Sequence, residues 1–218
     1  PEGICVPTIT NNTIRLHGVH GIFVHGAVNG SLGNNQIREN GQTGILVRES
    51  RRLTVEGNVV QHNGNGGILI GVGLSADTTS SDFAVTSNTV EDNRVSGAIR
   101  VLAGGDISVT GNTAARSPVT GIAVSGRPAT SVTVQDNDVL TTGADAVLVT
   151  DSAMVTVHQN TIDSAVENGV RLERVGDLSV TENVITRVGD TGVLAVVEGD
   201  VVMQENGVGG AGITGISV

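Results

Sequence analysis

The chain has 218 residues and a formal net charge of −10, and all twelve of its basic residues are arginines. The absence of a basic run argues against a nucleic-acid phosphate track, and no apolar stretch approaches the roughly 20 residues that a membrane span needs. Tryptophan and tyrosine are absent and only two phenylalanines occur, so small aliphatic side chains must fill the interior. This composition favours thin stacked layers. The single cysteine, Cys5, leaves neither an intramolecular disulfide nor a zinc-binding spacing.

One sequence frame recurs along the chain: apolar-x-apolar-x-x-Asn-x-apolar, then a loop, then Gly-apolar-x-apolar. It covers residues 53–60 and 67–70, then 107–114 and 121–124, and returns at 178–185 with Gly192 opening the next segment. Its Asn recurs at spacings of 23, 23, 30, 24, 25, 23, 23 and 23 residues. These positions are Asn12, Asn35, Asn58, Asn88, Asn112, Asn137, Asn160, Asn183 and Asn206. A sustained period of this length is typical of repeat architectures.

Each repeat contains three short alternating segments rich in Val, Ile and Thr, which indicate strands. Three strands and three bends in about 23 residues predict one coil, whose strands pair in parallel with those of the next coil. We therefore predict an all-β fold, a right-handed parallel β-helix of about nine coils. It should form a single domain over residues 1–218 and a rod about 40 Å long.

The recurring Asn is interpreted as a bend residue, because Asn tolerates a left-handed backbone better than other non-glycine residues. Gly57, Gly111 and Asp136 precede it in three repeats, as expected at a turn. Equivalent amides would lie one coil apart and hydrogen-bond along the rod as an Asn ladder. This pattern predicts a structural role for the asparagines.

These repeats resemble the parallel β-helix repeats of pectate lyases, polygalacturonases, alginate epimerases and lyases, phage tailspikes and many bacterial surface proteins. The resemblance covers nearly the whole chain and is specific for fold, but not for function. In polysaccharide-active members it implies a site on the outer face of the Gly-apolar-x-apolar strand. The residues expected to point outward there are Phe23, Leu46, Leu69, Arg100, Ala123, Leu148, Arg171, Leu194 and Ser217.

Most of this outward column is apolar, and an apolar outward stripe often marks a contacted surface. Phe23, Leu46, Leu69 and Leu148 are therefore predicted to form an apolar contact stripe, covered by a loop, a partner or a further segment. A ligand groove and an uncovered stripe are the alternatives.

The long repeat between Asn58 and Asn88 has its extra residues within 71–82. A surface insertion of this length is readily tolerated. The alternative is a loop that flanks a binding groove beside Arg100.

The segment Gly-Ala-Asp-Ala-Val at 143–147 resembles the Gly-Asp-Asp-Ala-Ile segment of polygalacturonases, with Ala144 at the first Asp. Thr120 stands one coil earlier where that family has an acid, and Asn168 one coil later replaces the His of its Gly-His-Gly. Asp145 is the one acid that remains of those this active site requires, which argues against a hydrolase of this type. Asp145 is interpreted as a turn residue.

The histidines of the first repeat, His17, His20 and His25, do not form a metal site. His20 and His25 bracket a strand about 16 Å long, too far apart for one ion. We expect no metal and no cofactor.

Another outward face carries Ser and Thr, as in the β-solenoids whose flat threonine arrays bind ice. Glu56, Gln135, His158 and Gln204 interrupt this array, and Thr is an ordinary strand residue. Ice binding is therefore a minor alternative.

We predict a non-catalytic extracellular or cell-surface module that presents one face to a polysaccharide or protein partner. The alternative is a carbohydrate-active enzyme, a polysaccharide lyase or epimerase rather than a hydrolase. Its candidate catalytic groups are His20, Arg100, Asp145 and Arg171, which would have to converge within about 10 Å on one groove.

The last residues, 215–218, match the first-strand frame of the repeat and show no charged or helical cap. Because open strand edges invite association, we expect a homo-oligomer or a segment of a longer rod.

Overall fold

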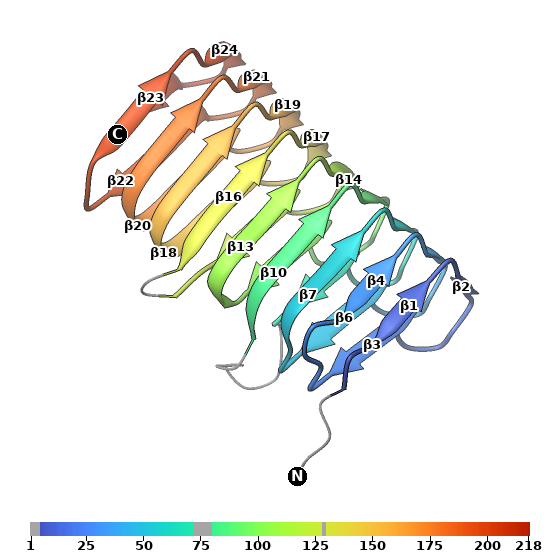
Figure 1. The fold of residues 1–218 in the computed structure, drawn as a ribbon. Coiled ribbons are helices and arrows are strands. Elements are labelled where there is room, and N and C mark those ends of the chain that lie inside the picture. Colours follow the sequence, from blue (N-terminus) through green and yellow to red (C-terminus); the bar gives the residue numbers. More distant parts are fainter. Residues whose placement is uncertain (1–4, 72–79, 128–129) are drawn as a thin grey trace.

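A computed structural model of the chain describes residues 5–71, 80–127 and 130–218. Its strands wind into coils that stack along one axis, with the N-terminus at one end of the rod and the C-terminus at the other (Figure 1). Neighbouring coils are joined by parallel strand pairing on three faces. The predicted all-β parallel β-helix of about nine coils, roughly 23 residues apart, is confirmed.

The first face contains the Gly-apolar-x-apolar segments. Its strands are β3 (Ile22–His25), β6 (Ile45–Arg48), β9 (Ile68–Ile70), β12 (Ile99–Leu102), β15 (Ile122–Ser125), the start of β18 (Val147–His158), the start of β20 (Val170–Thr181), β22 (Thr191–Val197) and β25 (Thr214–Ser217).

The second face carries the apolar-x-apolar segments that precede the Asn. Its strands are β1 (Thr8–Thr10), β4 (Ser31–Gly33), β7 (Arg51–Glu56), β10 (Ser81–Thr86), β13 (Gly104–Thr110), β16 (Ser131–Gln135), the second halves of β18 and β20, and β23 (Val201–Gln204).

The third face follows the Asn. It consists of β2 (Thr13–Arg15), β5 (Gln36–Arg38), β8 (Val59–Gln61), β11 (Thr89–Glu91), β14 (Thr113–Ser117), β17 (Asp138–Thr142), β19 (Thr161–Ala165), β21 (Val184–Val188) and β24 (Gly207–Ala211).

The interior consists of columns of aliphatic side chains, one per coil. On the second face the predicted valine column is confirmed, because its members pair in register and are fully buried. These are Val55, Val85, Val109, Val134, Val157 and Val180. Burying one such side chain contributes roughly 1.5–3 kcal/mol, so the columns supply most of the driving force for coil stacking.

The Asn ladder is also confirmed. Asn112 donates from its backbone N–H (2.9 Å) and its side-chain Nδ2 (3.0 Å) to Oδ1 of Asn137 in the next coil. Asn88 donates in the same way to Oδ1 of Asn112. Each amide thus accepts from the preceding coil and donates to the following one.

The sequence predicted a left-handed backbone conformation at the ladder Asn itself. In the structure the left-handed residue of this bend is the one before the Asn. Each of those nine residues has a φ between 52° and 66°. They are Asn11, Asn34, Gly57, Ser87, Gly111, Asp136, Gln159, Glu182 and Glu205. The ladder Asn must instead direct its amide into the rod, where its side chain reaches the neighbouring coil. The Gly and Asp residues seen before it in the sequence marked the true turn position.

The structure also contains a second, shorter Asn ladder that was not predicted from the sequence. Asn40 and Asn63 each donate from Nδ2 to Oδ1 of the next member, at 2.9 Å, and Asn93 ends the series. All three are buried. Each lies five residues after a member of the main ladder, and this Asn-x4-Asn spacing is the signal that could have revealed it.

We expect Val134→Asp to prevent folding, because an unpaired charge would be buried between two apolar layers. The matched control is Thr133→Asp, whose side chain points outward from the same strand and is only half-buried. Circular dichroism and soluble yield should separate the two variants. A folded, soluble Val134→Asp protein would contradict the inward orientation of this column.

We expect Asn112→Ala to lower the free energy of unfolding by about 1–3 kcal/mol, because the buried amide groups of Asn88 and Asn137 lose their partner. Asp138→Ala, an exposed substitution in the next coil, is the control. Denaturant titration measures both. Equal midpoints for the two variants would show that the ladder does not contribute to stability.

Candidate functional site

The outward column of the first face runs in register along the whole rod. Phe23 pairs with Leu46, Leu46 with Leu69, and Leu69 with Arg100. The column continues through Ala123, Leu148, Arg171, Leu194 and Ser217.

The apolar part of this column is mostly covered within the chain itself. Phe23 is 53% exposed, whereas Leu46 and Leu69 are only 2% and 4% exposed. Gly66, three residues before Leu69, supplies part of this cover. Its backbone packs so close to the Leu69 side chain that an added Cβ would lie 3.1 Å from Leu69 Cδ2. A partner could therefore reach Phe23 and the half-buried Leu148, but not the two leucines between them. The loop expected beside Arg100 falls largely on residues 72–79, which lie outside the described residues.

Phe23 is the centre of a small cluster at the N-terminal end of the first face. Its ring centroid lies 5.9 Å from that of His20 and 6.2 Å from that of His25. The Arg48 guanidinium carbon lies 6.0 Å from the Phe23 ring centroid. Burial and the nearby Arg48 charge hold the pKa of His20 below its ordinary value, which favours a neutral imidazole.

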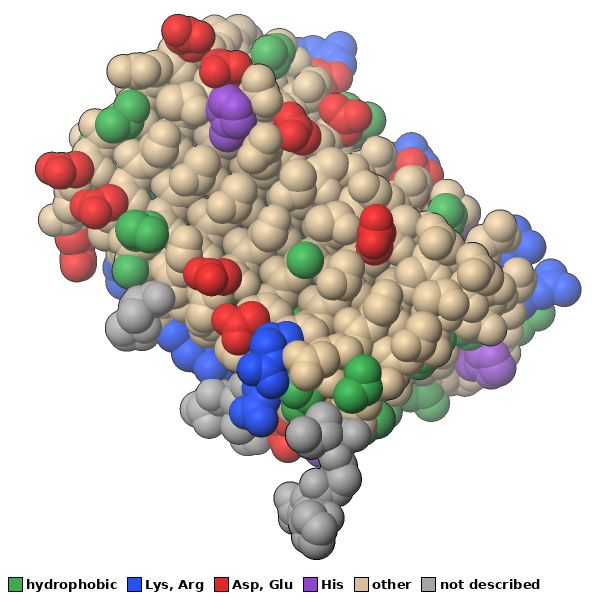
Figure 2. Space-filling view, viewed as in Figure 1, with side chains coloured by type: hydrophobic (Ala, Val, Ile, Leu, Met, Phe, Trp, Pro, Cys, Tyr) green, Lys and Arg blue, Asp and Glu red, His purple; other side chains and the backbone are tan. Residues whose placement is uncertain are grey.

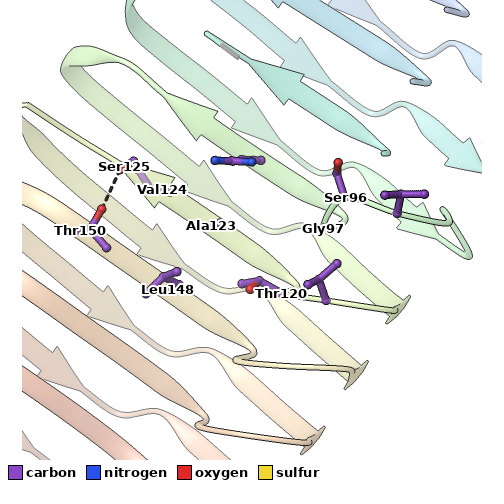
Figure 3. A pocket seen from close by; sticks show the side chains of 11 residues that line it. Ser96, Gly97, Thr120, Ala123, Val124, Ser125, Leu148 and Thr150 are labelled. Carbon is purple, nitrogen blue, oxygen red and sulfur yellow. Dashed lines mark hydrogen bonds between the residues drawn. The ribbon is translucent and has the colours of Figure 1, made fainter. Parts of the chain in front are cut away.

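A pocket of about 290 Å³ lies on the first face between β12 and β18 (Figure 3). Arg100 is exposed at this pocket and forms no hydrogen bond or ion pair with the residues that the structure describes. Opposite it, the hydroxyls of Ser125 and Thr150 are 2.7 Å apart. The lining consists of Val95, Ser96, Gly97, Arg100, Val119, Thr120, Ala123, Val124, Ser125, Leu148 and Thr150. The pocket thus combines one cation, several hydroxyls and an apolar floor.

Asp145 and Arg171 come together farther along the same face. Asp145 is 3% exposed, and its Oδ1 accepts hydrogen bonds from the backbone N–H (3.2 Å) and Nδ2 (2.7 Å) of Asn168. The Asp145 Oδ2 lies 3.7 Å from Arg171 Nη1, and Arg171 also donates from Nε to Glu173 at 2.8 Å. The bonds to Glu173 raise the pKa of Arg171 further above its ordinary value. Asp145 is thus tied into the structure on both of its oxygens.

The four candidate catalytic residues do not form one centre. Asp145 and Arg171 are neighbours, but Arg100 lies three strands from Arg171, about 14 Å away at the usual strand spacing. His20 occupies the first coil, five coils from Asp145 or about 24 Å. No group of three or more His, Cys, Asp or Glu side chains suited to a metal ion occurs within the described ranges.

The second face presents a different surface. Figure 2 shows it as broad and nearly free of charge, with the charged side chains gathered around its edges. One outward column supplies most of its hydroxyls: Thr8, Ser31, Thr54, Ser108, Thr133, Thr156 and Ser179, with Ala84 between Thr54 and Ser108. The neighbouring column is interrupted by Glu56, Gln135 and His158, as the sequence indicated.

The family profile described as a right-handed β-helix region matches residues 3–139 and 73–218, which together span almost the whole chain. This chain belongs to the right-handed β-helix family. A comparison with curated proteins finds no significant match.

Two solved structures share the β-helix fold. One is the A-module of the Azotobacter vinelandii mannuronan C-5 epimerase AlgE6, with a TM-score of 0.65 and 17% identity over 97% of this chain. The other is a glycoside hydrolase, with a TM-score of 0.56 and 13% identity over 88% of this chain. This β-helix covers only 58% and 38% of those two chains. At these identities the likeness shows the fold alone. Among the residues described, no helix is long and apolar enough to cross a membrane.

We expect His20 to titrate below its ordinary pKa of 6.5, and Arg48→Gln to raise its pKa, because one of the two causes of the shift is removed. Because the folded-state pKa of His20 is lowered, the fold favours the neutral imidazole. Its contribution to the free energy of unfolding is fully present above pH 6.5 and is lost as the pH falls through the folded-state pKa. NMR titration of the imidazole measures the shift, with Arg38→Gln as a control. A His20 that titrates at or above 6.5 would show that the ring is not shielded as described.

Proposed function

We propose that this chain is a non-catalytic extracellular or cell-surface β-helix module that binds an acidic polysaccharide on its first face. The observation that carries the proposal is the pocket at Arg100, where an exposed guanidinium has no anionic partner among the described residues. The face lies on a rigid scaffold of stacked strands, which would hold the binding groups in place without a large ordering cost.

The pocket lining suits a sugar chain. Arg100 presents the planar fork of donors that matches a carboxylate, and charge-assisted bonds of this kind are strong. The Thr120 hydroxyl can both donate to and accept from a sugar hydroxyl. The Ser96 hydroxyl already donates to Asn65 Oδ1 at 2.9 Å, so it can serve a sugar hydroxyl as an acceptor. Leu148 offers an apolar contact for the less polar face of a ring. A few polar groups around an apolar floor are typical of small-molecule sites.

Arg171 is less suited to this role than Arg100. Its guanidinium is already engaged by Glu173 and lies beside Asp145. A ligand carboxylate would have to displace one of these acids. The proposal therefore assigns recognition of the acidic group to Arg100 and a structural role to Arg171.

The lining also argues against catalysis at this pocket. Proton transfer to or from a sugar needs a positioned acid and base, and Arg100 is the only ionisable side chain among the described residues that line the pocket. Asp145 is occupied by Asn168 and Arg171. The groups that line this pocket could therefore bind a sugar chain, but they offer no acid and base for a reaction on it.

A carbohydrate-active enzyme is the second candidate. The cluster of Asp145, Arg171 and Glu173 on the same face favours it, as do the structural neighbours named for epimerase and glycoside hydrolase activity. In that case a polysaccharide incubated with the chain would gain reducing ends, unsaturated sugars or inverted uronates, and Asp145→Asn would abolish the change. The absence of all three products would leave the binding module.

We expect Arg100→Gln to weaken binding of a soluble uronate polymer by about tenfold to a hundredfold, because a charge-assisted bond is lost. Arg94→Gln is the matched control, since Arg94 is exposed at the start of the same turn but does not line the pocket. Affinity electrophoresis or calorimetry against uronate and neutral polymers measures the effect. Equal losses in both variants, or equal affinity for both polymers, would overturn the proposal.

A further inference from the structure

The pocket at Arg100, in the middle coils of the rod, owes its shape to one small residue. In the outward column of the first face, Ala123 pairs with Arg100 on one side and with Leu148 on the other. At the usual strand spacing these two larger side chains stand about 10 Å apart, with only a methyl group between them. Several other coils have leucine at the equivalent position: Leu46, Leu69, Leu148 and Leu194. A leucine in place of Ala123 would therefore fill the hollow.

One wall of this hollow is apolar and open to solvent. Val95 and Val119 each follow a ladder Asn by seven residues in consecutive coils, and they are 63% and 38% exposed. Both line the pocket together with the half-buried Leu148. The hydroxyls of a sugar ring gain nothing from such a wall, whereas an apolar substituent is removed from water there. The volume of about 290 Å³ is at the lower end of ligand pockets, which span roughly 300–1,000 Å³, so the substituent must be small.

The hydroxyls of the lining differ in what they can still offer to a ligand. The Ser96 hydroxyl donates to Asn65 Oδ1 at 2.9 Å, and the hydroxyls of Ser125 and Thr150 lie 2.7 Å apart. The half-buried Thr120 hydroxyl, in contrast, forms no hydrogen bond with the residues that the structure describes. Thr120 is therefore the hydroxyl of this lining whose proton is free to be donated.

Thr120 places this donor beside the apolar wall. It follows Val119 directly in the chain, and Figure 3 shows Thr120 and Leu148 on the same side of Ala123. A group that suits both features has an oxygen that only accepts and a small apolar end. A carbonyl with a methyl group attached has this form, and sugars carry it as an acetyl group.

We propose that the pocket binds an acetylated acidic sugar, with the sugar carboxylate on Arg100 and the acetyl group over Ala123. The acetyl carbonyl accepts from the Thr120 hydroxyl, and its methyl group packs against Val119 and Leu148. This inference rests on the proposed function, since it needs an acidic polysaccharide on the first face, and it adds the substituent that the pocket selects. An acetyl ester and an acetamide share this chemistry.

Matched polymers test the inference. The first is an O-acetylated polyuronate, and its reference is the same polymer after mild alkaline hydrolysis, which removes the acetyl esters and keeps the carboxylates. A third, a uronate polymer with N-acetylated amino sugars, presents the acetyl group as an amide. Calorimetry at equal uronate concentration should show an acetylated polymer bound about tenfold more tightly than the reference, because a buried methyl group and a hydrogen bond are gained. The preferred acetylated polymer identifies the ester or the amide.

The outcomes separate this inference from the proposed function. If neither acetylated polymer binds more tightly than the deacetylated reference, but the reference binds, the acetyl assignment is wrong and the proposed function stands. If none of the three polymers binds, both are wrong.

Two substitutions test the residues assigned to the acetyl group. Ala123→Leu should abolish the preference for the acetylated polymer, because the leucine fills the hollow, and it should fold, because leucine occupies this column in other coils. Thr120→Val removes the hydroxyl at nearly constant shape and should reduce the preference by about twofold to tenfold. The matched control is Thr89→Val, a half-buried threonine on the third face. Thermal midpoints report whether each variant is folded. An unchanged preference in folded Ala123→Leu, or equal effects of Thr120→Val and Thr89→Val, would overturn the inference.

Discussion

Each coil of this protein must place the same residue directly above its counterpart in the previous coil, because the ladder asparagines donate twice to one oxygen of the next coil. This constraint fixes the register of the second and third faces, which flank the ladder. The longest spacing in the ladder, from Asn58 to Asn88, illustrates it. Val55 still pairs with Val85 and Val60 with Val90, so the extra residues are confined to the connection between β9 and β10.

Not every corner of the coil depends on hydrogen bonds in this way. The second ladder ends at Asn93, and its column continues through Ser117, Thr142 and Ala165. Ser117 and Thr142 donate to backbone carbonyls of their own coil, at 2.9 and 3.1 Å, and not to the next coil. The coil geometry is retained without the amide contact, because the strands on either side are held by parallel pairing and aliphatic columns. The second ladder therefore adds to stability at the N-terminal half without defining the fold.

The surface of the rod divides into regions with different chemistry. The first face has a covered apolar segment, a pocket at the exposed Arg100 and a hydrogen-bonded cluster around Asp145, spread over successive coils. Such a division suits a polymer that lies along the rod, since several of its units could meet different coils at once. His20, Arg100 and the Asp145–Arg171 pair do not meet in one centre, because they lie on different coils. The scaffold is rigid, so these distances cannot be closed by a small rearrangement.

The sequence by itself determined the fold class, the number of coils, the main Asn ladder and the interior valine column. The regular repeat sets the length of one coil, and the alternation within each strand decides which apolar side chains face the interior. It did not determine which residue at the bend is left-handed, because Gly57 and Asp136 are as suited to that position as the Asn that follows each of them. It also did not determine which outward residues are reachable. Leu46, Leu69 and Arg100 occupy equivalent positions in consecutive coils, yet the two leucines are covered and the arginine is exposed. That difference in exposure cannot be read from the repeat, in which the three positions are equivalent, and it appears only in the folded chain. The pairing of Asp145 with Asn168 and Arg171 was decided there as well, because residues 23 and 26 positions apart become neighbours only when two coils stack.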